Sequence, residues 1–337
     1  MNLNTRQASY GADEIGLICG FHFDVRQTGR EIDSGSVVNW LQQDQRQGFL
    51  WLHFNLAHAP CERWMRTHLA LPDDFFNMLR DGSSSTRIEH IDHALLAVIN
   101  DVAFNFNLVS TDVSSMLVYV HQQILITARA KPLRSVDQLR AAVKRGEQFH
   151  SSLALLVHLL QDQADILSRI VRNTTGEIDD IEDKLLAQRG HDNRAELASM
   201  RRTLVRLQRL LAPEPSALFR LLNRPPDWLQ EQDVQDLRES TEEFSLVLND
   251  LTSLVERIKL LQEELAAQLN EQTNKTLFTL TMVTVLALPI NIVAGFFGMN
   301  VGGIPLADHP HGFWVLVAFV AGFTGLAGTW AFRGKRN

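Results

Sequence analysis

The sequence predicts an α/β domain followed by a long stalk helix and two C-terminal transmembrane helices. Short apolar runs of strand length alternate with helical segments up to about residue 134. The interval 227–288 contains neither glycine nor proline, so nothing there interrupts helical hydrogen bonding. Two stretches, 276–297 and 313–332, contain no charged residue, and each is long enough to cross a hydrocarbon core of about 30 Å.

The composition indicates a large water-soluble part. The 337 residues are 45% hydrophobic and 21% charged, with a net charge of −7, which is enough for a core of its own. Residues 1–12 lack the pattern of a signal peptide, and Cys19 and Cys61 are too few for a disulfide framework, so we expect this part in the cytosol. The acidity argues against nucleic acid as a partner and attracts cations. We find no nucleotide loop, nucleophile motif or catalytic acid pair, and we expect no enzyme.

The expected elements follow from the apolar spacing. Strands are expected at 16–23, 48–55, 94–99, 115–120 and 123–128 and around Phe104 and Phe106, and surface helices at 36–47 and 61–80. Further helices are expected at 135–146, 151–171, 175–189, 194–211 and 216–222, with breaks at Gly146, Gly176, Gly190, Pro213 and Pro215. The stalk carries an apolar seam, either a bundle within the chain or a subunit interface: Phe244, Val247, Leu251, Leu254, Ile258, Leu261 and Leu265.

A motif closes the first predicted span. Asn274-Lys275-Thr276 begins this segment, Pro289 lies within it, and Gly295-Phe296-Phe297-Gly298-Met299-Asn300 ends it. This layout resembles the CorA family of divalent-cation transporters, and Val301-Gly302-Gly303-Ile304-Pro305 resembles its ZntB zinc-transporter branch. Phe297 departs from the tyrosine that is usual in the magnesium branch. The resemblance implies a funnel-shaped homopentamer in the inner membrane, with the first span lining the pore and the second forming an outer ring.

A stripe of polar and small residues runs along the predicted first span. Steps of seven place these side chains on two neighbouring lines: Asn274, Leu277, Thr281, Thr284, Leu288, Asn291 and Gly295. In lipid such a stripe faces other helices or water, and with the resemblance it predicts a pore lining. The alternative is that threonine hydroxyls bond back to their own helix and only Asn291 meets a neighbour. On the second span, small residues at a three-residue spacing favour close helix packing.

The loop between the spans is the predicted ion entrance. Lys275 precedes the first span and Arg333, Lys335 and Arg336 follow the second, whereas 298–312 contains no lysine or arginine. Both termini are therefore predicted to be cytosolic. The resemblance implies that Gly298, Met299 and Asn300 form the entrance, with Asn300 holding a hydrated ion. Asp308, His309 and His311 are either ordinary loop residues or zinc ligands.

Two histidine clusters outside the spans are candidates for a regulatory zinc site. The first comprises His53, His58 and Cys61. The second comprises Glu89, His90 and His93, whose spacing places two ligands on one face if that segment is helical. Surface or satisfied core positions are the alternative for each.

The predicted organisation and function follow from these features. The domains are an α/β domain (1–134), a helical region (135–226), the stalk (227–275), the first transmembrane helix (276–297), the external loop (298–312), the second transmembrane helix (313–332) and a basic tail (333–337). The predicted function is zinc transport, with cadmium, nickel and cobalt as further cargo and without a permanently bound cofactor. A magnesium, cobalt or nickel channel of the same family is the nearest alternative, and a membrane-anchored coiled-coil scaffold or sensor is the alternative of another class. Proton-linked uptake is implied by the resemblance, although neither span contains an ionisable residue.

Overall fold

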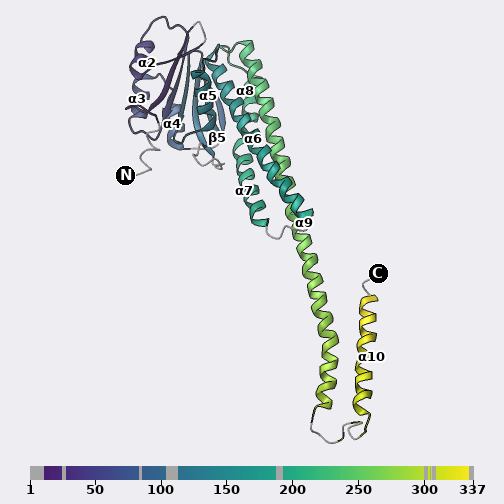
Figure 1. Ribbon diagram of the computed structural model, residues 1–337. Helices are drawn as coiled ribbons and strands as arrows, with labels where there is room; N and C mark the ends of the chain where they lie inside the picture. Colours follow the sequence, from purple (N-terminus) through teal and green to yellow (C-terminus); the bar gives the residue numbers. More distant parts are fainter. Residues whose placement is uncertain are drawn as a thin grey trace. The chain divides into compact units, whose positions relative to one another are not determined.

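A computed structural model describes residues 11–24, 28–82, 86–103, 113–186, 193–299, 303, 305 and 309–333. The chain divides into two compact units, Met1–Leu261 and Gln262–Asn337 (Figure 1). The strand expected at Phe104 and Phe106 lies outside the described residues.

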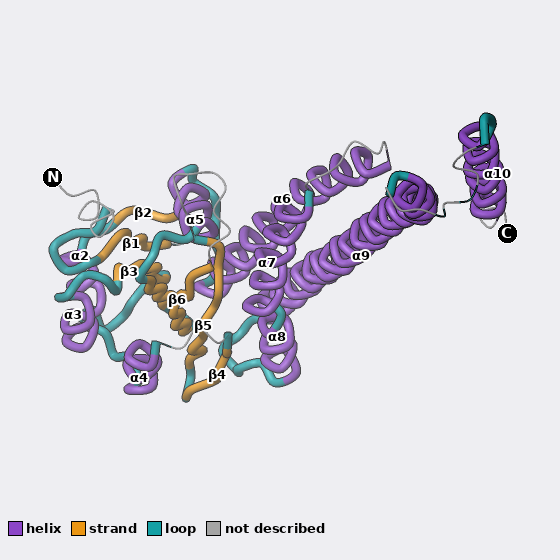
Figure 2. Tube along the Cα trace, turned by 90° about the horizontal axis from the view of Figure 1, so that it is seen from below, coloured by secondary structure: helices purple, strands orange, loops and turns teal. Residues whose placement is uncertain are grey.

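The first unit is built around a mixed sheet, which has seven strands in the described part of the chain (Figure 2). The strands are β1 (Leu17–Phe23), β2 (Gly29–Glu31), β3 (Phe49–Asn55), β4 (Arg87–Ile91), β5 (Ala94–Val102), β6 (Val113–His121) and β7 (Ile124–Arg129). Their order is β2-β1-β3-β7-β6-β5-β4. Among the described strand pairs, β3 and β7 are parallel and the other pairs are antiparallel. The edge strands β2 and β4 were not predicted, because their exposed residues lack the apolar alternation of a half-buried strand.

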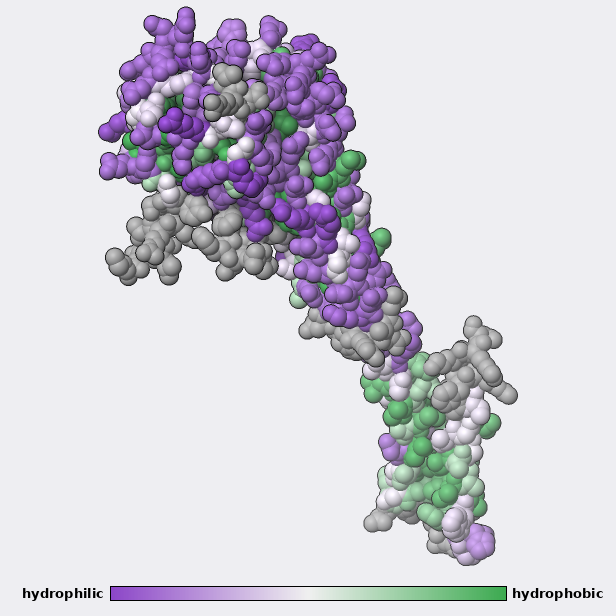
Figure 3. Space-filling view, turned by 45° about the horizontal axis from the view of Figure 1, so that its top comes forward, coloured by the Kyte–Doolittle hydropathy of each residue, from purple (hydrophilic) through white to green (hydrophobic). Residues whose placement is uncertain are grey.

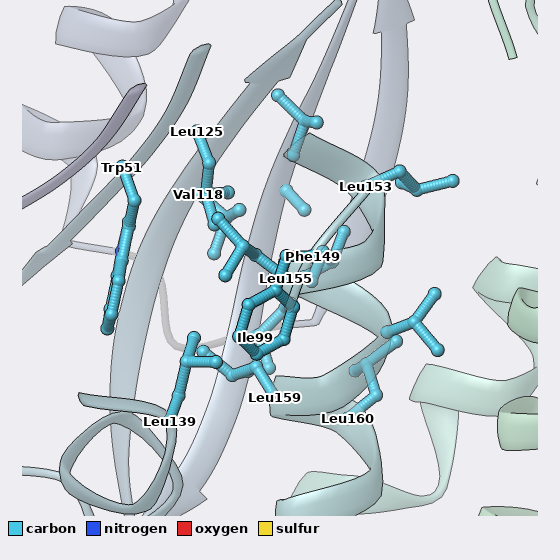
Figure 4. Packing of buried hydrophobic residues seen from close by; sticks show 14 of the residues in the cluster. Trp51, Ile99, Val118, Leu125, Leu139, Phe149, Leu153, Leu155, Leu159 and Leu160 are labelled. Atoms are coloured by element: carbon cyan, nitrogen blue, oxygen red, sulfur yellow. The ribbon is translucent and has the colours of Figure 1, made fainter. Parts of the chain in front are cut away.

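Helices cover both faces of this sheet. One face carries α2 (Ser34–Leu41), α3 (Cys61–His68) and α4 (Asp73–Asp81), and the other α5 (Arg134–Lys144), α6 (Ser152–Leu186) and α8 (Pro213–Asn223). The pleat explains the two cores, since Trp51 packs on the α5–α6 side and its neighbours Leu50 and Leu52 on the other. Figure 4 shows Trp51 and Leu125 facing leucines of α6. This confirms the predicted α/β class.

Several predicted helix boundaries are wrong. Helix α6 continues through Gly176, because Ile178, Ile181 and Leu185 extend its buried face and offset the roughly 1 kcal/mol that glycine costs in a helix. The segment 61–80 forms two helices rather than one, and 36–47 is helical only as far as Leu41. Helix α8 begins at Pro213, a first-turn position where proline is tolerated.

A helical bundle extends from the sheet. Helix α7 (Arg194–Leu211) and the first part of α9 (Glu231–Phe297) lie beside α6. Arg257 of α9 pairs with Asp179 (2.7 Å) and Glu182 of α6, and Gln208 of α7 donates to Thr252 of α9 at 2.8 Å. The seam residues with the least exposed surface are Phe244, Leu251, Leu254, Ile258, Leu261 and Leu265. The apolar seam is therefore covered within a single chain, as the bundle alternative predicts.

The second unit contains the apolar segments. Helix α9 has 67 residues and, among the described residues, is the one helix long and apolar enough to cross a membrane. Helix α10 (Gly312–Arg333) has 22 residues, and its part from Gly312 to Leu326 is a shorter apolar helix. Figure 3 shows hydrophobic side chains gathered on these segments and hydrophilic ones on the first unit.

Candidate functional site

The predicted pore residues share one side of α9. At about 100° per residue, Asn274, Leu277, Thr281, Thr284, Leu288, Asn291 and Gly295 fall within an arc of roughly 100°. All seven are exposed in the single chain, including Leu277 (54%) and Leu288 (58%). We call this set the α9 arc. A single chain thus leaves uncovered a continuous line of amide, hydroxyl and leucine side chains.

The hydroxyls of the α9 arc bond within their own helix. Thr281 Oγ1 donates to the Leu277 carbonyl at 2.8 Å, and Thr284 Oγ1 donates to the Leu280 carbonyl at 2.9 Å. These bonds are the ones that the back-bonding alternative describes. A hydroxyl oxygen also carries two acceptor lone pairs, so each threonine can still accept a hydrogen bond from the water shell of an ion. The two alternatives are therefore compatible at these positions.

Pro289 modifies the helix between Thr284 and Asn291. It lies inside α9 and has no N–H, so the carbonyl of Val285 loses its normal donor four residues later. An additional acceptor is thus available in the same turn as the arc residues. Asn291 has an exposed amide and, in the described part of the chain, no side-chain hydrogen bond.

The end of α9 explains the glycine of the motif. The Gly298 N–H donates to the Ala294 carbonyl at 2.9 Å and closes the last turn. A Cβ at Gly298 would lie 3.0 Å from that carbonyl oxygen, which is tighter than most Cβ contacts, so the last turn would have to shift slightly to admit it. Met299 is 48% exposed. Asn300 lies outside the described residues.

His309 and His311 lie together before α10. Their ring centroids are 6.0 Å apart, and the His311 N–H donates to Nδ1 of His309 at 3.2 Å. In a neutral ring this bond places the remaining proton on Nε2. Metal ligation by Nε2 of His309 therefore requires the other tautomer, and ligation by Nδ1 requires this hydrogen bond to break. Both rings are exposed. Asp308 lies outside the described residues, as do Lys335 and Arg336, whereas Lys275 pairs with Glu271 at 2.7 Å.

The clusters in the first unit are not arranged as metal sites. His53 is buried, with Nδ1 bonded to Thr127 Oγ1 (2.8 Å) and Nε2 accepting from Arg129 (3.1 Å), and burial and Arg129 lower its pKa. Burial raises the pKa of the Cys61 thiol to about 12, which disfavours a metal-binding thiolate. The helical face expected for His90 and His93 is wrong, because β4 and its turn occupy this segment. No group of three metal-ligating side chains occurs among the described residues.

The family is decided by sequence comparison. Residues 46–333 match the family model described as CorA-like Mg2+ transporter protein. The chain belongs to this family. The CorA-like chain is 27% identical over 334 residues to the divalent cation transporter CmaX of Pseudomonas aeruginosa, covering 98% of this chain and 99% of that protein. It is 25% identical over 321 residues to the zinc transport protein ZntB of Pectobacterium carotovorum, covering 91% and 98%. A structure of full-length CmaX matches with a TM-score of 0.82 over 97% of this chain and 99% of that one.

Family membership confirms the general class of function. The CorA-like chain is a membrane protein and a divalent-cation transporter, not an enzyme, and transporters of this family are oligomeric. A scaffold or sensor without transport is therefore excluded.

Sequence reasoning missed a set of buried acids in this CorA-like chain. Asp101 and Glu214 are fully buried, and Asp162 is largely buried. Burial raises their pKa values to about 6, 8 and 7, respectively. The available signal is the sequence Pro213-Glu214-Pro215, whose prolines by themselves predict only a helix break.

Proposed function

We propose that the chain assembles as a homopentamer around a pore lined by residues 276–297 of α9, and that zinc is its main cargo. The α9 arc carries this proposal. In a hydrocarbon core the amide of Asn291 needs a partner or water, and the described part of one chain gives it no hydrogen-bond partner. Copies of α9 arranged around an axis would supply a partner or enclose a water-filled path.

The proposed mechanism conducts an ion that keeps much of its water. Stripping water from a small divalent cation is difficult, whereas hydrogen-bonding to the bound water is favourable. Rings formed by Asn274, Thr281, Thr284 and Asn291 would accept such bonds, and Leu277 and Leu288 would form narrow apolar sections. We propose that Asn300 holds the ion at the outer mouth, while Gly298 permits the turn that directs the Asn300 side chain inward. The spans 276–297 and 313–332 contain no ionisable residue, so if uptake is coupled to protons, loop groups such as Asp308, His309 and His311 or a file of water would carry them.

Two observations favour zinc over magnesium as the cargo. One relative over most of the chain is named a zinc transport protein, and the exposed pair His309 and His311 offers nitrogen ligands, which zinc accepts and magnesium does not prefer. The alternative cargo is magnesium, cobalt or nickel.

Removing both loop imidazoles tests this choice of cargo. We expect His309→Ala with His311→Ala to lower zinc uptake on the order of tenfold while leaving magnesium uptake unchanged, because only zinc gains from imidazole. Uptake of zinc, cadmium, cobalt and magnesium into sealed vesicles measures the effect. The matched control replaces His90 and His93, which are exposed in the first unit. Equal losses of zinc and magnesium would remove the selectivity role, and wild-type uptake of magnesium without zinc would favour the alternative cargo.

We also propose that both termini lie in the cytosol and that 298–312 is external, since Lys275 and the basic tail flank the spans. A cysteine at Ala307 should then react with an impermeant thiol reagent outside intact cells, whereas one at Asn337 should not. The native Cys19 and Cys61 are buried, so the background is low. Labelling at Asn337 alone would reverse the orientation.

A further inference from the structure

Glu214 is a buried carboxyl with little to stabilise a charge. It is the second residue of α8 and has no exposed surface. Its Oε2 accepts one hydrogen bond, from Nε2 of Gln163 at 3.2 Å. Its Oε1 is buried without a hydrogen-bond partner among the described residues, and so is Oε1 of Gln163. An ionised carboxylate here would therefore have one neutral donor where it could accept several bonds.

The start of α8 does not provide the missing donors. A helix N-terminus normally stabilises an anion through free N–H groups in its first turn. In α8, Pro213 and Pro215 occupy two of the first three positions, and neither has an N–H. The usual support for a first-turn glutamate is thus largely absent.

The orientation of Gln163 is fixed by its surroundings. Its Nε2 donates both to Glu214 Oε2 and to the Asn100 carbonyl of β5, the latter at 2.5 Å. Because this atom faces two oxygen acceptors, it must be the amide nitrogen. If the Gln163 amide were flipped, its oxygen would face both of those oxygens without a proton between them. The Asn100 side chain in turn donates to Thr86 Oγ1 at 2.9 Å and to the Leu210 carbonyl at 3.4 Å. The sheet, α6, α7 and α8 therefore meet in one polar cluster.

The charges around Glu214 also favour its neutral form. In the described part of the chain, the charged group that acts on Glu214 is Asp101 of β5, whose negative charge disfavours a second anion. Asp101 itself lies next to Ser135 and Arg134 of α5. The α6 residue in contact, Gln163, is neutral, as are Thr86 and the Leu210 carbonyl. Asp162, next to Gln163 in the sequence, lies 3.7 Å from His158, and the charges of Asp165, Glu147, Asp101 and Arg145 act on it. Burial, with the field of Asp101, raises the pKa of Glu214 from 4.5 to about 8.

We propose that Glu214 is a proton-binding site that joins α8 to the sheet. The bound proton forms the hydroxyl of a neutral carboxyl on Glu214, and this hydroxyl supplies a donor for Oε1 of Gln163, so that acid and amide bond reciprocally. Release of the proton leaves a buried anion and separates α8 from β4 and β5. Because residues 224–230 lead directly from α8 to α9, the pH around this domain acts on the start of the stalk. The inference concerns the first unit alone and holds whichever cation is transported.

Hydrogen exchange of the full-length protein tests the site. The folded-state pKa lies above the ordinary value, so the stabilisation is complete below about pH 4.5 and is lost as the pH rises towards 8. The measured quantity is the exchange rate of the α8 backbone amides of residues 216–223, expressed as the rate in the wild type divided by the rate in Glu214→Gln. We expect this ratio to rise roughly tenfold per pH unit between pH 5 and 8 and then to level off. The amide of Glu214→Gln mimics the neutral acid and removes the titration.

Three comparisons keep this test decisive. Asp165→Asn neutralises an exposed acid of α6, the helix that also carries Gln163. This variant should retain the wild-type pH dependence. Glu214→Met should be as independent of pH as Glu214→Gln, although less stable. Should both Glu214 variants fail to fold, exchange of α8 relative to β3 in the wild-type chain gives the same slope. A constant ratio between pH 5 and 8 would overturn the proposal.

Discussion

Replacing Asn300 by alanine is expected to abolish uptake of every divalent cation, to the level of vesicles without protein. The change removes the proposed ring of amide oxygens at the outer mouth. Hydrogen bonds that involve a charged partner contribute about 1.5–3 kcal/mol each, and 1.4 kcal/mol already corresponds to about tenfold in occupancy. Uptake of zinc, cadmium, cobalt and magnesium into sealed vesicles is the measurement, and all four are expected to fall together.

Met299 provides the matched control for Asn300. It lies next to Asn300 and is partly exposed in the single chain, and we assign it a packing role in the turn rather than a role as a metal ligand. Met299→Leu conserves volume and apolar character, so near-normal uptake is expected. Undiminished uptake by Asn300→Ala would contradict the capture role.

The sequence predicted the long helix and the α/β class because both depend on local patterns. Without glycine or proline from 227 to 288, α9 has no local reason to end, and alternating apolar runs identified the central strands. The sequence also predicts the apolar seam at Leu251, Leu254 and Ile258, but it does not identify the helices that cover this seam. Only the fold shows that these residues are covered within the chain.

The errors arose where tertiary packing overrides local signals. Gly176 was expected to end a helix, yet burial of Ile178 and Ile181 carries α6 through it. Strand β4 has no fully buried side chain and pairs with β5 through its backbone, which no apolar pattern reveals. The partners of Glu214 and His53 come from segments 51 and 74 residues away, so neither environment could be inferred from neighbouring residues.

Replacing Asn291 by leucine is expected to reduce cation uptake at least about tenfold while the oligomer stays assembled. Asn291 lies within the α9 arc, and a ring of leucines there would add an apolar constriction in place of polar groups. The matched control is Thr279→Leu, another replacement of a polar side chain by leucine but on the opposite side of α9, where the hydroxyl bonds only to the Lys275 carbonyl in the described chain. This control should leave uptake unchanged, because its side chain faces away from the proposed pore.

Zinc uptake and oligomer mass, measured on the same vesicle preparations of wild type, Asn291→Leu and Thr279→Leu, test the proposed pore most directly. The account predicts a pentamer for all three proteins, with uptake lost only in Asn291→Leu. Normal uptake by an assembled Asn291→Leu protein would contradict a conduction path along the α9 arc, and loss of the oligomer in that variant would show that Asn291 bridges helices instead.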